Sequence, residues 1–416
     1  MFYWGVGKMD ILHSDCNNFY ASVELLSHPE LKDKPMVVCG SIKDRHGIIL
    51  SKNYPAKALG MFTGQTLVEA FQLCPTLVAI EADFEKYLAI SRKVKDIYRE
   101  YSDRVESFGI DEAWIDVTHS KIFGTPMEIA EKIRTRIKNE IGITVSIGVS
   151  FNKVFAKLAS DLKKPDAVSE ISQENFKKVA WNLPVKDLLF VGRATTKKFS
   201  KLNIETIGDL ANYSESLLEK KFGKWGKTLF KYANGLDNSI VRKVGEHTEI
   251  KSVGNSLTCY RNLETMEDVK ALLTVLSESV ANRMFSYGIY KARTLSLTAR
   301  DTNLSSVTRQ IKFLAPTGLS GDILSTALEL FEKSNIQLPL RSMGISVCDF
   351  VYENEQLSLF QNPEKYNKLY ALDRTVKKIR DKNNFSVLTR GSVKIDNRLS
   401  LVNPQDDHTI HPVGVI

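Results

Sequence analysis

The sequence predicts a multidomain α+β protein, on three observations. Segments with the spacing of strands and of helices alternate from residue 10 to residue 165, which is typical of a mixed α and β unit of catalytic size. Short helical segments with many lysines occupy residues 172–235. Residues 249–350 follow the order strand, helix, strand, strand, helix, strand, which predicts a second α+β domain with a ferredoxin-like sheet.

The elements of the first unit are bounded by apolar runs and by the turns between them. A buried strand at 10–12 passes through a turn near Asn17 into a helix that reaches Leu26. Further strands are predicted at 36–40, 47–50, 105–108, 113–117 and 143–149, and further helices at 51–60, 83–101, 126–141 and 153–163. Only Gly109 to Glu112 separate two of these strands, which is the length of a hairpin turn.

The second half of the chain continues after a linker at 241–248. Strands are predicted at 257–260, 292–299, 307–313 and 344–350, with helices at 267–286 and 321–333. From residue 351 the composition is polar and only a stretch near 365–380 has helical spacing. We therefore expect a flexible tail over 351–416.

Composition excludes several classes of protein. The 416 residues carry 57 Lys and Arg against 49 Asp and Glu, and the net charge of +8 favours polyanionic partners. Five cysteines without C-x-x-C spacing argue against a disulfide framework and a structural zinc site, and they fit a reducing cytoplasm. No apolar run reaches about 18 residues and the start of the chain does not resemble a secretion signal, so we expect neither a membrane span nor secretion.

Three carboxylates stand where packing alone would not place them. Asp15 closely follows the first buried strand, and Asp111 and Glu112 occupy the short gap between two later strands. If these strands pair, the acids converge at one sheet edge, where they repel one another unless hard cations lie between them. A pair of Mg²⁺ ions about 4 Å apart suits such a site and suits phosphoryl transfer. On spacing alone, an acidic hairpin turn and an Asx turn explain the same residues equally well.

A second group of side chains suits a triphosphate. Ser51, Tyr54 and Lys57 are spaced three residues apart, so on a helical turn they lie roughly on one side. A hydroxyl, a phenol and an ammonium supply the donors and the positive charge that phosphates require. Lys164, just before Pro165, offers one more cation. Taken one at a time, the two lysines are more simply explained as solvated surface residues.

Four sequence blocks resemble the signature blocks of the Y-family DNA polymerases, and in particular the DNA polymerase IV-like branch of Gram-positive bacteria. The blocks are DCNNFYASVE at 15–24, SKNYPAK at 51–57, SFGIDEAWID at 107–116 and GVSFNKVFAKLASDLKKP at 148–165. The similarity extends over about residues 9–360, in the order and with the spacings of the family. It implies a template-directed DNA polymerase that performs low-fidelity translesion synthesis in DNA repair and damage tolerance.

The resemblance also implies a role for each matched residue. Asp15, Asp111 and Glu112 are expected to bind two Mg²⁺ ions, which Mn²⁺ can replace, and the backbone carbonyl of Cys16 is expected to be a further ligand. Tyr20 is expected to be the steric gate, whose ring collides with the 2′-hydroxyl of a ribonucleotide. The triphosphate is expected to be held by the backbone amides around Phe19 and Tyr20 and by the side chains of Ser51, Tyr54, Lys57 and Lys164.

Two positions depart from the family's pattern. Lys57 stands where many relatives have Arg, so a bidentate phosphate contact becomes a point charge. The polymerase V-like branch also tends to carry Lys there, which leaves the branch open. Phe190 stands where the first Gly of a helix-hairpin-helix turn is expected, so only Gly192 remains to offer its amide to a DNA phosphate. Lys197 and Lys198 are expected to compensate electrostatically.

Further DNA contacts and a protein partner are expected from the second half of the chain. KSVGNS at 251–256 resembles the start of the family's little-finger domain, whose sheet contacts phosphates rather than bases. Its candidate DNA-binding residues are Lys251, Arg300 and Arg341. QLSLF at 356–360 resembles the bacterial sliding-clamp-binding peptide, because an exposed apolar segment in polar surroundings suits docking. In that peptide Gln356 is the polar anchor, and Leu357, Leu359 and Phe360 fill an apolar pocket.

The resemblance divides the chain as a right-hand polymerase. The expected domains are a palm at 1–20 and 81–165, small fingers at 21–80, a helical thumb at 166–240, the linker, a little finger at 249–350 and the tail. The expected partners are primer–template DNA, deoxyribonucleoside triphosphates and the sliding clamp, bound by a cytoplasmic monomer. The alternatives are an enzyme like the polymerase V catalytic subunit, a nucleotidyl cyclase, and a non-catalytic repair regulator that binds DNA and the clamp. A cyclase needs neither the lysine-rich helices nor the peptide at 356–360.

Overall fold

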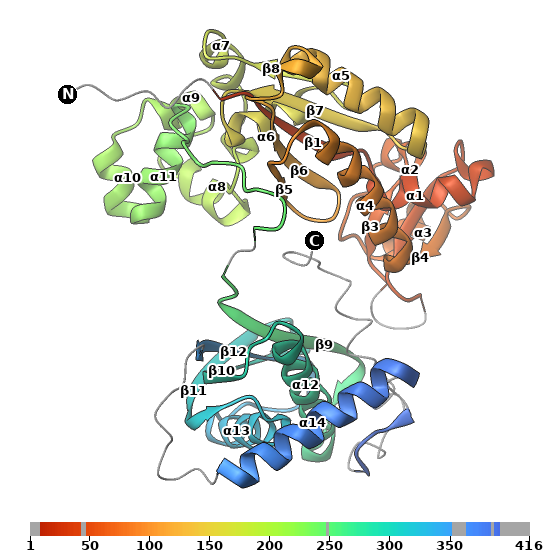
Figure 1. Ribbon diagram of the computed structural model, residues 1–416, viewed down its shortest axis with the longest axis vertical. Helices are drawn as coiled ribbons and strands as arrows, with labels where there is room; N and C mark the ends of the chain where they lie inside the picture. The colour runs from red at the N-terminus through yellow and green to blue at the C-terminus, as the bar shows by residue number, and fades with distance from the viewer. Residues whose placement is uncertain (1–8, 43–46, 247–248, 352–362, 384–386, 392–416) are drawn as a thin grey trace. The chain divides into compact units, whose positions relative to one another are not determined.

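The chain forms two compact units (Figure 1). The computed structural model describes residues 9–42, 47–246, 249–351, 363–383 and 387–391. The first unit comprises Ile48–His247 together with Met1–Gly40, and Thr248–His411 belong to the second. The division falls at the end of the segment that the sequence predicts to be a linker. Across the described ranges, no helix is long and apolar enough to cross a membrane.

A five-stranded sheet lies at the centre of the first unit. Its strands are β1 (Ile11–Cys16), β5 (Val105–Ser107), β6 (Glu112–Asp116), β7 (Val145–Ser150) and β8 (Val168–Ile171). They are ordered β5-β6-β1-β7-β8, and β1 is antiparallel to both of its neighbours. The sequence does not predict β8, because this strand closely follows a proline and its four residues are too few to show a clear alternation.

Helices cover both faces of this sheet (Figure 1). α1 (Phe19–Ser27), α4 (Phe84–Tyr101) and α5 (Pro126–Arg136) pack on one face around a large apolar core. α6 (Lys153–Leu162) packs on the other face, where Ala156 meets Ile11. Because successive strand residues point to opposite faces, Ile11, His13 and Asp15 share the face that α6 covers. The alternation of β1 therefore decides which side chains can reach α6.

A small sheet and a group of short helices complete the first unit. The small sheet, ordered β3-β2-β4, consists of β2 (Met36–Cys39), β3 (Ile49–Lys52) and β4 (Val78–Glu81), and it is accompanied by α2 (Tyr54–Ala58) and α3 (Leu67–Leu73). The helical group consists of α7 (Phe176–Ala180), α8 (Arg193–Ser200), α9 (Ile207–Ala211), α10 (Glu215–Phe222) and α11 (Lys224–Ala233). The small sheet has an apolar core of its own, whereas the helical group shares its core with α6 and β8.

The second unit confirms the predicted order of strands and helices. β9 (Ser252–Leu263), β10 (Lys291–Asp301), β11 (Ser306–Thr317) and β12 (Leu340–Val351) form an antiparallel sheet ordered β11-β10-β12-β9. α12 (Met266–Ser286) and α13 (Ser320–Lys333) pack on the apolar face of this sheet. The strands are longer than predicted, because buried residues such as Val253, Leu263 and Met343 continue them beyond the apolar runs.

A third helix, α14 (Pro363–Asn383), also belongs to the second unit. Nη1 of Arg380 donates to Oε2 of Glu278 in α12 over 2.8 Å, and both side chains are buried. The carboxylate of Asp373 accepts a hydrogen bond from the backbone N–H of Ser320, at the first turn of α13, over 2.9 Å. α14 confirms the helical spacing near residues 365–380, whereas the predicted flexibility is wrong for residues 363–383 and 387–391, because they pack on the second unit. Their polar composition misleads because three of their charged side chains, Asp373, Arg380 and Arg390, bond to residues of α12 and α13.

We expect the replacement of Arg380 by Met to destabilise the second unit by about 2–4 kcal/mol, because it leaves the buried Glu278 carboxylate short of a cation. Nε of Arg390 also donates to Glu278, over 2.5 Å, and keeps the loss below that of an unpaired charge. Urea unfolding of the full chain, followed by circular dichroism, measures the loss. Asp381→Asn, which breaks a more exposed ion pair of the same helix with Lys377, is the matched control and should cost less than about 1 kcal/mol. Equal losses in the two variants would contradict the buried pairing.

Candidate active site

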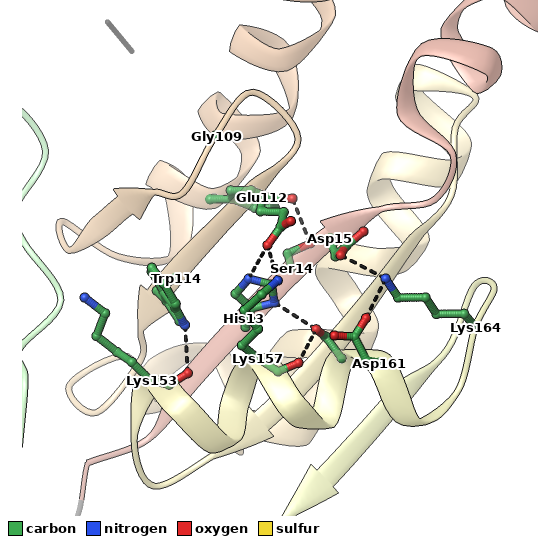
Figure 2. A network of polar contacts seen from close by, with 12 residues as sticks. His13, Ser14, Asp15, Gly109, Glu112, Trp114, Lys153, Lys157, Asp161 and Lys164 are labelled. Carbon is green, nitrogen blue, oxygen red and sulfur yellow. Dashed lines mark hydrogen bonds and ion pairs between the residues drawn. The ribbon is translucent and has the colours of Figure 1, made fainter. Parts of the chain in front are cut away.

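The three carboxylates predicted from the sequence lie at one edge of the five-stranded sheet. Asp15 near the end of β1 lies opposite Glu112, the first residue of β6, in the strand register. Asp111 immediately precedes β6, and its carbonyl oxygen accepts a hydrogen bond from the backbone N–H of Cys16 over 3.0 Å. The predicted pairing of these strands is confirmed. Figure 2 shows Asp15 and Glu112 on the side of the sheet that faces α6.

The turn that carries Asp111 is held by α4. Nζ of Lys95 donates to the carbonyl oxygen of Gly109 over 3.0 Å, and the hydroxyl of Ser91 donates to the carbonyl oxygen of Ile110. Gly109 has a φ of 101°, a left-handed conformation that glycine adopts readily. Burial lowers the pKa of Lys95 to about 8. The turn that carries Asp111 is therefore held through its backbone carbonyls by two side chains of α4.

A buried histidine and a lysine fix the Glu112 side chain (Figure 2). Nε2 of His13 lies 3.1 Å from Oε2 of Glu112, and Nδ1 of the same ring lies 2.9 Å from Oγ of Ser160 in α6. Nζ of Lys157 contacts the same carboxylate oxygen. Although burial opposes ionisation, the hydrogen bond from His13 and the charge of Lys157 lower the pKa of Glu112 to about 2. Glu112 is thus held as a carboxylate.

The other two acids, Asp15 and Asp111, differ in whether a cation lies beside the carboxylate. Nζ of Lys164 lies 2.8 Å from Oδ2 of Asp15 and 2.8 Å from Oδ1 of Asp161. Burial raises the pKa of Asp15 in spite of that lysine. Asp111 has no ion pair among the described residues, and burial, followed by the negative charges of Glu112 and Asp15, raises its pKa to about 7.

These acids fit hard divalent cations by the type of their donor atoms. All three offer carboxylate oxygens, which are the ligands that Mg²⁺ prefers. Burial is the main cause of the raised pKa of Asp111, and a cation would compensate the second cause, the negative charges of Glu112 and Asp15. Within the part of the chain that the structure describes, no three acidic, imidazole or thiol groups already converge as a metal cage. The reason is visible in Figure 2, since Glu112 is turned toward His13 and Lys157, and Asp15 toward Lys164.

An aromatic platform fixes the ring of Tyr20. This ring stacks on the ring of Tyr87, with 4.6 Å between the centroids and 21° between the planes, and Phe84 meets it edge-on at 5.8 Å. The hydroxyl of Tyr87 donates to Glu24 over 2.6 Å, which keeps the platform in place. Burial, followed by the charge of Asp111, raises the pKa of Tyr20 to about 12. Tyr20 is therefore a rigid neutral ring near the carboxylates.

The predicted triphosphate ligands border the same region. Phe19 and Tyr20 form the first turn of α1, where Asn18 makes no side-chain cap. The buried hydroxyl of Ser51 accepts a hydrogen bond from the backbone N–H of Ala21 over 3.4 Å. Tyr54 is close enough to Lys164 to sense its charge, although burial dominates and raises the pKa of the phenol. Lys57 is exposed in α2 and has no contact with the carboxylates.

The predicted DNA-binding residues fall on both units. Gly192 is the N-cap of α8 and is exposed, as are Lys197 and Lys198 in the last turn of that helix. In the second unit, Lys251 and Arg300 are exposed and Arg341 is half-buried. The predicted clamp-binding residues Gln356, Leu357, Leu359 and Phe360 lie outside the described residues.

His13 and Lys157 are site residues that the sequence reasoning missed, although the sequence holds a signal for each. His13 lies two residues before Asp15, so a strand places both side chains on one face. Lys157 lies seven residues before Lys164, which is close to two helical turns. α6 ends at Leu162, just before Lys164, so both lysines approach the sheet edge from this segment.

Three protein-family models match segments of this chain, and curated relatives match it over most of its length. Residues 14–161 match the impB/mucB/samB family, residues 250–359 match the C-terminal domain of that family, and residues 186–237 match a DNA polymerase-iota thumb domain. DNA polymerase IV of Acetivibrio thermocellus is 47% identical over 399 residues, which cover 95% of this chain and 100% of the relative. DNA polymerase IV of Clostridium kluyveri is 36% identical, over 91% of this chain and 96% of the relative.

Two solved structures are similar in fold. A Y-family DNA polymerase chimera of Dbh and Dpo4 matches with a TM-score of 0.72 and 25% identity. The match covers 83% of this chain and 100% of the chimera's chain. A Dbh ternary complex matches with a TM-score of 0.57 and 24% identity over the same shares of the two chains.

Proposed function

Since this chain belongs to the Y family of DNA polymerases, we propose that Asp15, Asp111 and Glu112 form the metal-dependent centre at which it extends DNA. The protein is a DNA-directed DNA polymerase of the translesion type, and its substrates are primer–template DNA and deoxyribonucleoside triphosphates. The register that sets Asp15 opposite Glu112, with Asp111 beside them, carries the proposal.

We assign Mg²⁺ as the ion of this site, with Mn²⁺ as a substitute. The three carboxylates and the carbonyl oxygen of Cys16, which follows Asp15 at the end of β1, would be its ligands. When bound, the cations lower the pKa of the primer 3′-hydroxyl and neutralise charge on the triphosphate. His13 and Lys157 hold Glu112 ionised and in place before any ligand arrives.

The surrounding residues bind and select the nucleotide. The backbone amides of the first turn of α1 point along the helix axis and suit a phosphate, and Ser51 lies beside that turn. Lys164, Tyr54 and Lys57 add positive charge and donors for the triphosphate. Lys164 is now paired with Asp15, so it must exchange one anion for another when the nucleotide binds. Tyr20, fixed on Tyr87, is the gate against ribose.

The substructures correspond to the parts of a right-hand polymerase. We assign the five-stranded sheet and its helices to the palm, the small sheet with α2 and α3 to the fingers, and the helical group at 176–233 to the thumb. The second unit is the little finger, and it includes α14. The protein's proposed contacts with DNA phosphates lie in the thumb and in the little finger. They are Gly192, Lys197 and Lys198 in the thumb, and Lys251, Arg300 and Arg341 in the little finger. We further propose that the protein acts as a monomer in the cytoplasm, where its five free cysteines stay reduced.

Primer extension tests the proposed function. We expect the purified chain to extend a primed template with deoxyribonucleotides and Mg²⁺, and to make no cyclic nucleotide from ATP or GTP alone. Extension should continue across an abasic site or a minor-groove guanine adduct, as expected of a translesion enzyme. A chain that binds DNA but does not extend the primer would instead be the non-catalytic regulator.

We also propose that the peptide at 356–360 binds the sliding clamp. Both of its flanks, Val351 at the end of β12 and α14 from residue 363, belong to the second unit. Replacing Leu359 and Phe360 by Ala removes two of the three apolar side chains proposed to fill the pocket, so we expect the stimulation of synthesis by the clamp to fall by about tenfold or more. Synthesis without the clamp should be unchanged. Unaltered stimulation would remove this peptide from the clamp interface.

A further inference from the structure

Phe190 holds a backbone conformation that a glycine would adopt more readily. Its φ of 67° lies in the left-handed region, which is uncommon for a bulky side chain. The residue occupies the turn before α8, where a helix-hairpin-helix has its first glycine, and half of the side chain is exposed. A large residue in this conformation needs compensating contacts, so the surroundings of its ring indicate what it does.

The Phe190 ring connects the helical group to the central sheet. It meets the ring of Trp225 in α11 with 5.6 Å between the centroids and an angle of 63°. On the other side it meets the ring of Phe108 at 6.3 Å and 85°. Phe108 in turn contacts Trp114 of β6 at 4.7 Å. These edge-on and tilted geometries are favourable for aromatic pairs. We call Trp114, Phe108, Phe190 and Trp225 the aromatic bridge.

Phe108 is also part of the turn that carries the acids. Its backbone N–H donates to the carbonyl oxygen of Glu112 over 2.9 Å, which closes the turn around Asp111. Nζ of Lys157, which contacts the Glu112 carboxylate, lies 5.5 Å from the centroid of the Phe108 ring. A displacement of Phe108 therefore acts on the catalytic turn through its backbone and on Glu112 through Lys157.

We propose that Phe190 is a positioning residue that supports the catalytic turn through Phe108. A glycine at this position would relax the hairpin backbone but would leave Phe108 without its partner on the side of the helical group. Phe190, in place of the glycine of the hairpin pattern, thus adds a contact between the thumb and the catalytic turn. The position of the hairpin therefore affects the rate of DNA synthesis. This inference rests on the proposed function of Asp15, Asp111 and Glu112.

The test is the Phe190→Gly variant of the full chain in single-turnover primer extension. We expect the rate constant to fall about threefold to tenfold, the range that corresponds to the loss of one aromatic pair. The Mg²⁺ concentration for half-maximal rate should rise, because the carboxylates are less well placed. The affinity for primer–template DNA should stay within about twofold, because glycine suits the hairpin backbone.

Three further variants make the test specific. Phe190→Tyr keeps the aromatic ring, so its rate constant should equal that of the wild type. Phe222→Leu weakens another aromatic pair of the helical group, with Phe199, and should lower thermal stability without changing the rate. Phe108→Leu and Phe190→Gly should be non-additive when combined, since they act through one contact. A wild-type rate in Phe190→Gly, additive losses in the double variant, or an equal rate loss in Phe222→Leu would overturn the proposal. An active Asp111→Ala variant would instead overturn the proposed function on which it rests.

Discussion

Replacing Asp111 by Ala should lower the single-turnover rate of primer extension by about a thousandfold or more. Asp111 is the acid without an ion pair among the described residues, so no lysine would have to be displaced before it coordinated a cation. Loss of one of the carboxylates that hold the divalent cations removes several kcal/mol of transition-state stabilisation. DNA binding should be unchanged, because the phosphate contacts that we propose lie elsewhere.

The same variant should not be less stable than the wild type. The raised pKa of Asp111 shows that the fold disfavours its charged form, and the hydrogen bonds that hold its turn come from Lys95 and Ser91 to backbone carbonyls. Asp116→Asn is the matched control, because Asp116 lies in the same hairpin but accepts its hydrogen bonds from Thr118. It should keep the wild-type rate. An Asp111→Ala enzyme that extends primers at a normal rate would remove Asp111 from the catalytic site.

Replacing Tyr20 by Ala should raise the relative incorporation of ribonucleotides by about a hundredfold, while DNA synthesis stays measurable. The ring has little freedom to move away from a 2′-hydroxyl, because it stacks on Tyr87 and meets Phe84 edge-on. A hundredfold change corresponds to about 2.7 kcal/mol of discrimination, which is reasonable for a rigid steric clash. The measurement is the ratio of kcat/KM for a ribonucleotide to that for the matching deoxyribonucleotide.

Tyr20→Phe is the control that separates the ring from its hydroxyl. Phenylalanine keeps the stacking surface, so sugar discrimination should stay close to that of the wild type. If the Ala variant also discriminates as well as the wild type, then another group excludes ribose and Tyr20 is only a packing residue.

The sequence predicts the core of the fold because its signals are local. The apolar runs of β1 and β6 and the four-residue gap between β5 and β6 mark these strands in the sequence, and the pairing of β1 with β6 in the structure then sets Asp15 opposite Glu112. Long helices such as α4 and α12 have clear caps, at Asp83 and Thr265, and are predicted to within a residue or two. Short elements such as α3 and β8 carry too few residues to show a period.

What the sequence does not predict depends on contacts between distant segments. The burial of Arg380 against Glu278 joins residues 102 positions apart, and nothing in the polar composition of α14 indicates it. The contact of His13 with Glu112 likewise needs the sheet register. The sequence shows that Phe190 stands in place of a glycine. Its contacts with the rings of Phe108 and Trp225 are not predicted, because these residues come from other parts of the chain.

Asp15, Asp111 and Glu112 are expected to share divalent cations beside a bound nucleotide. The most direct test is to count bound Mn²⁺ by electron paramagnetic resonance in a complex of the full chain with a chain-terminated primer–template and the next deoxyribonucleotide. The wild-type complex should hold two Mn²⁺ ions, and the Asp111→Ala/Glu112→Ala variant should bind fewer with the same DNA and nucleotide present. An equal number of bound ions in the two proteins would show that Asp111 and Glu112 do not hold them.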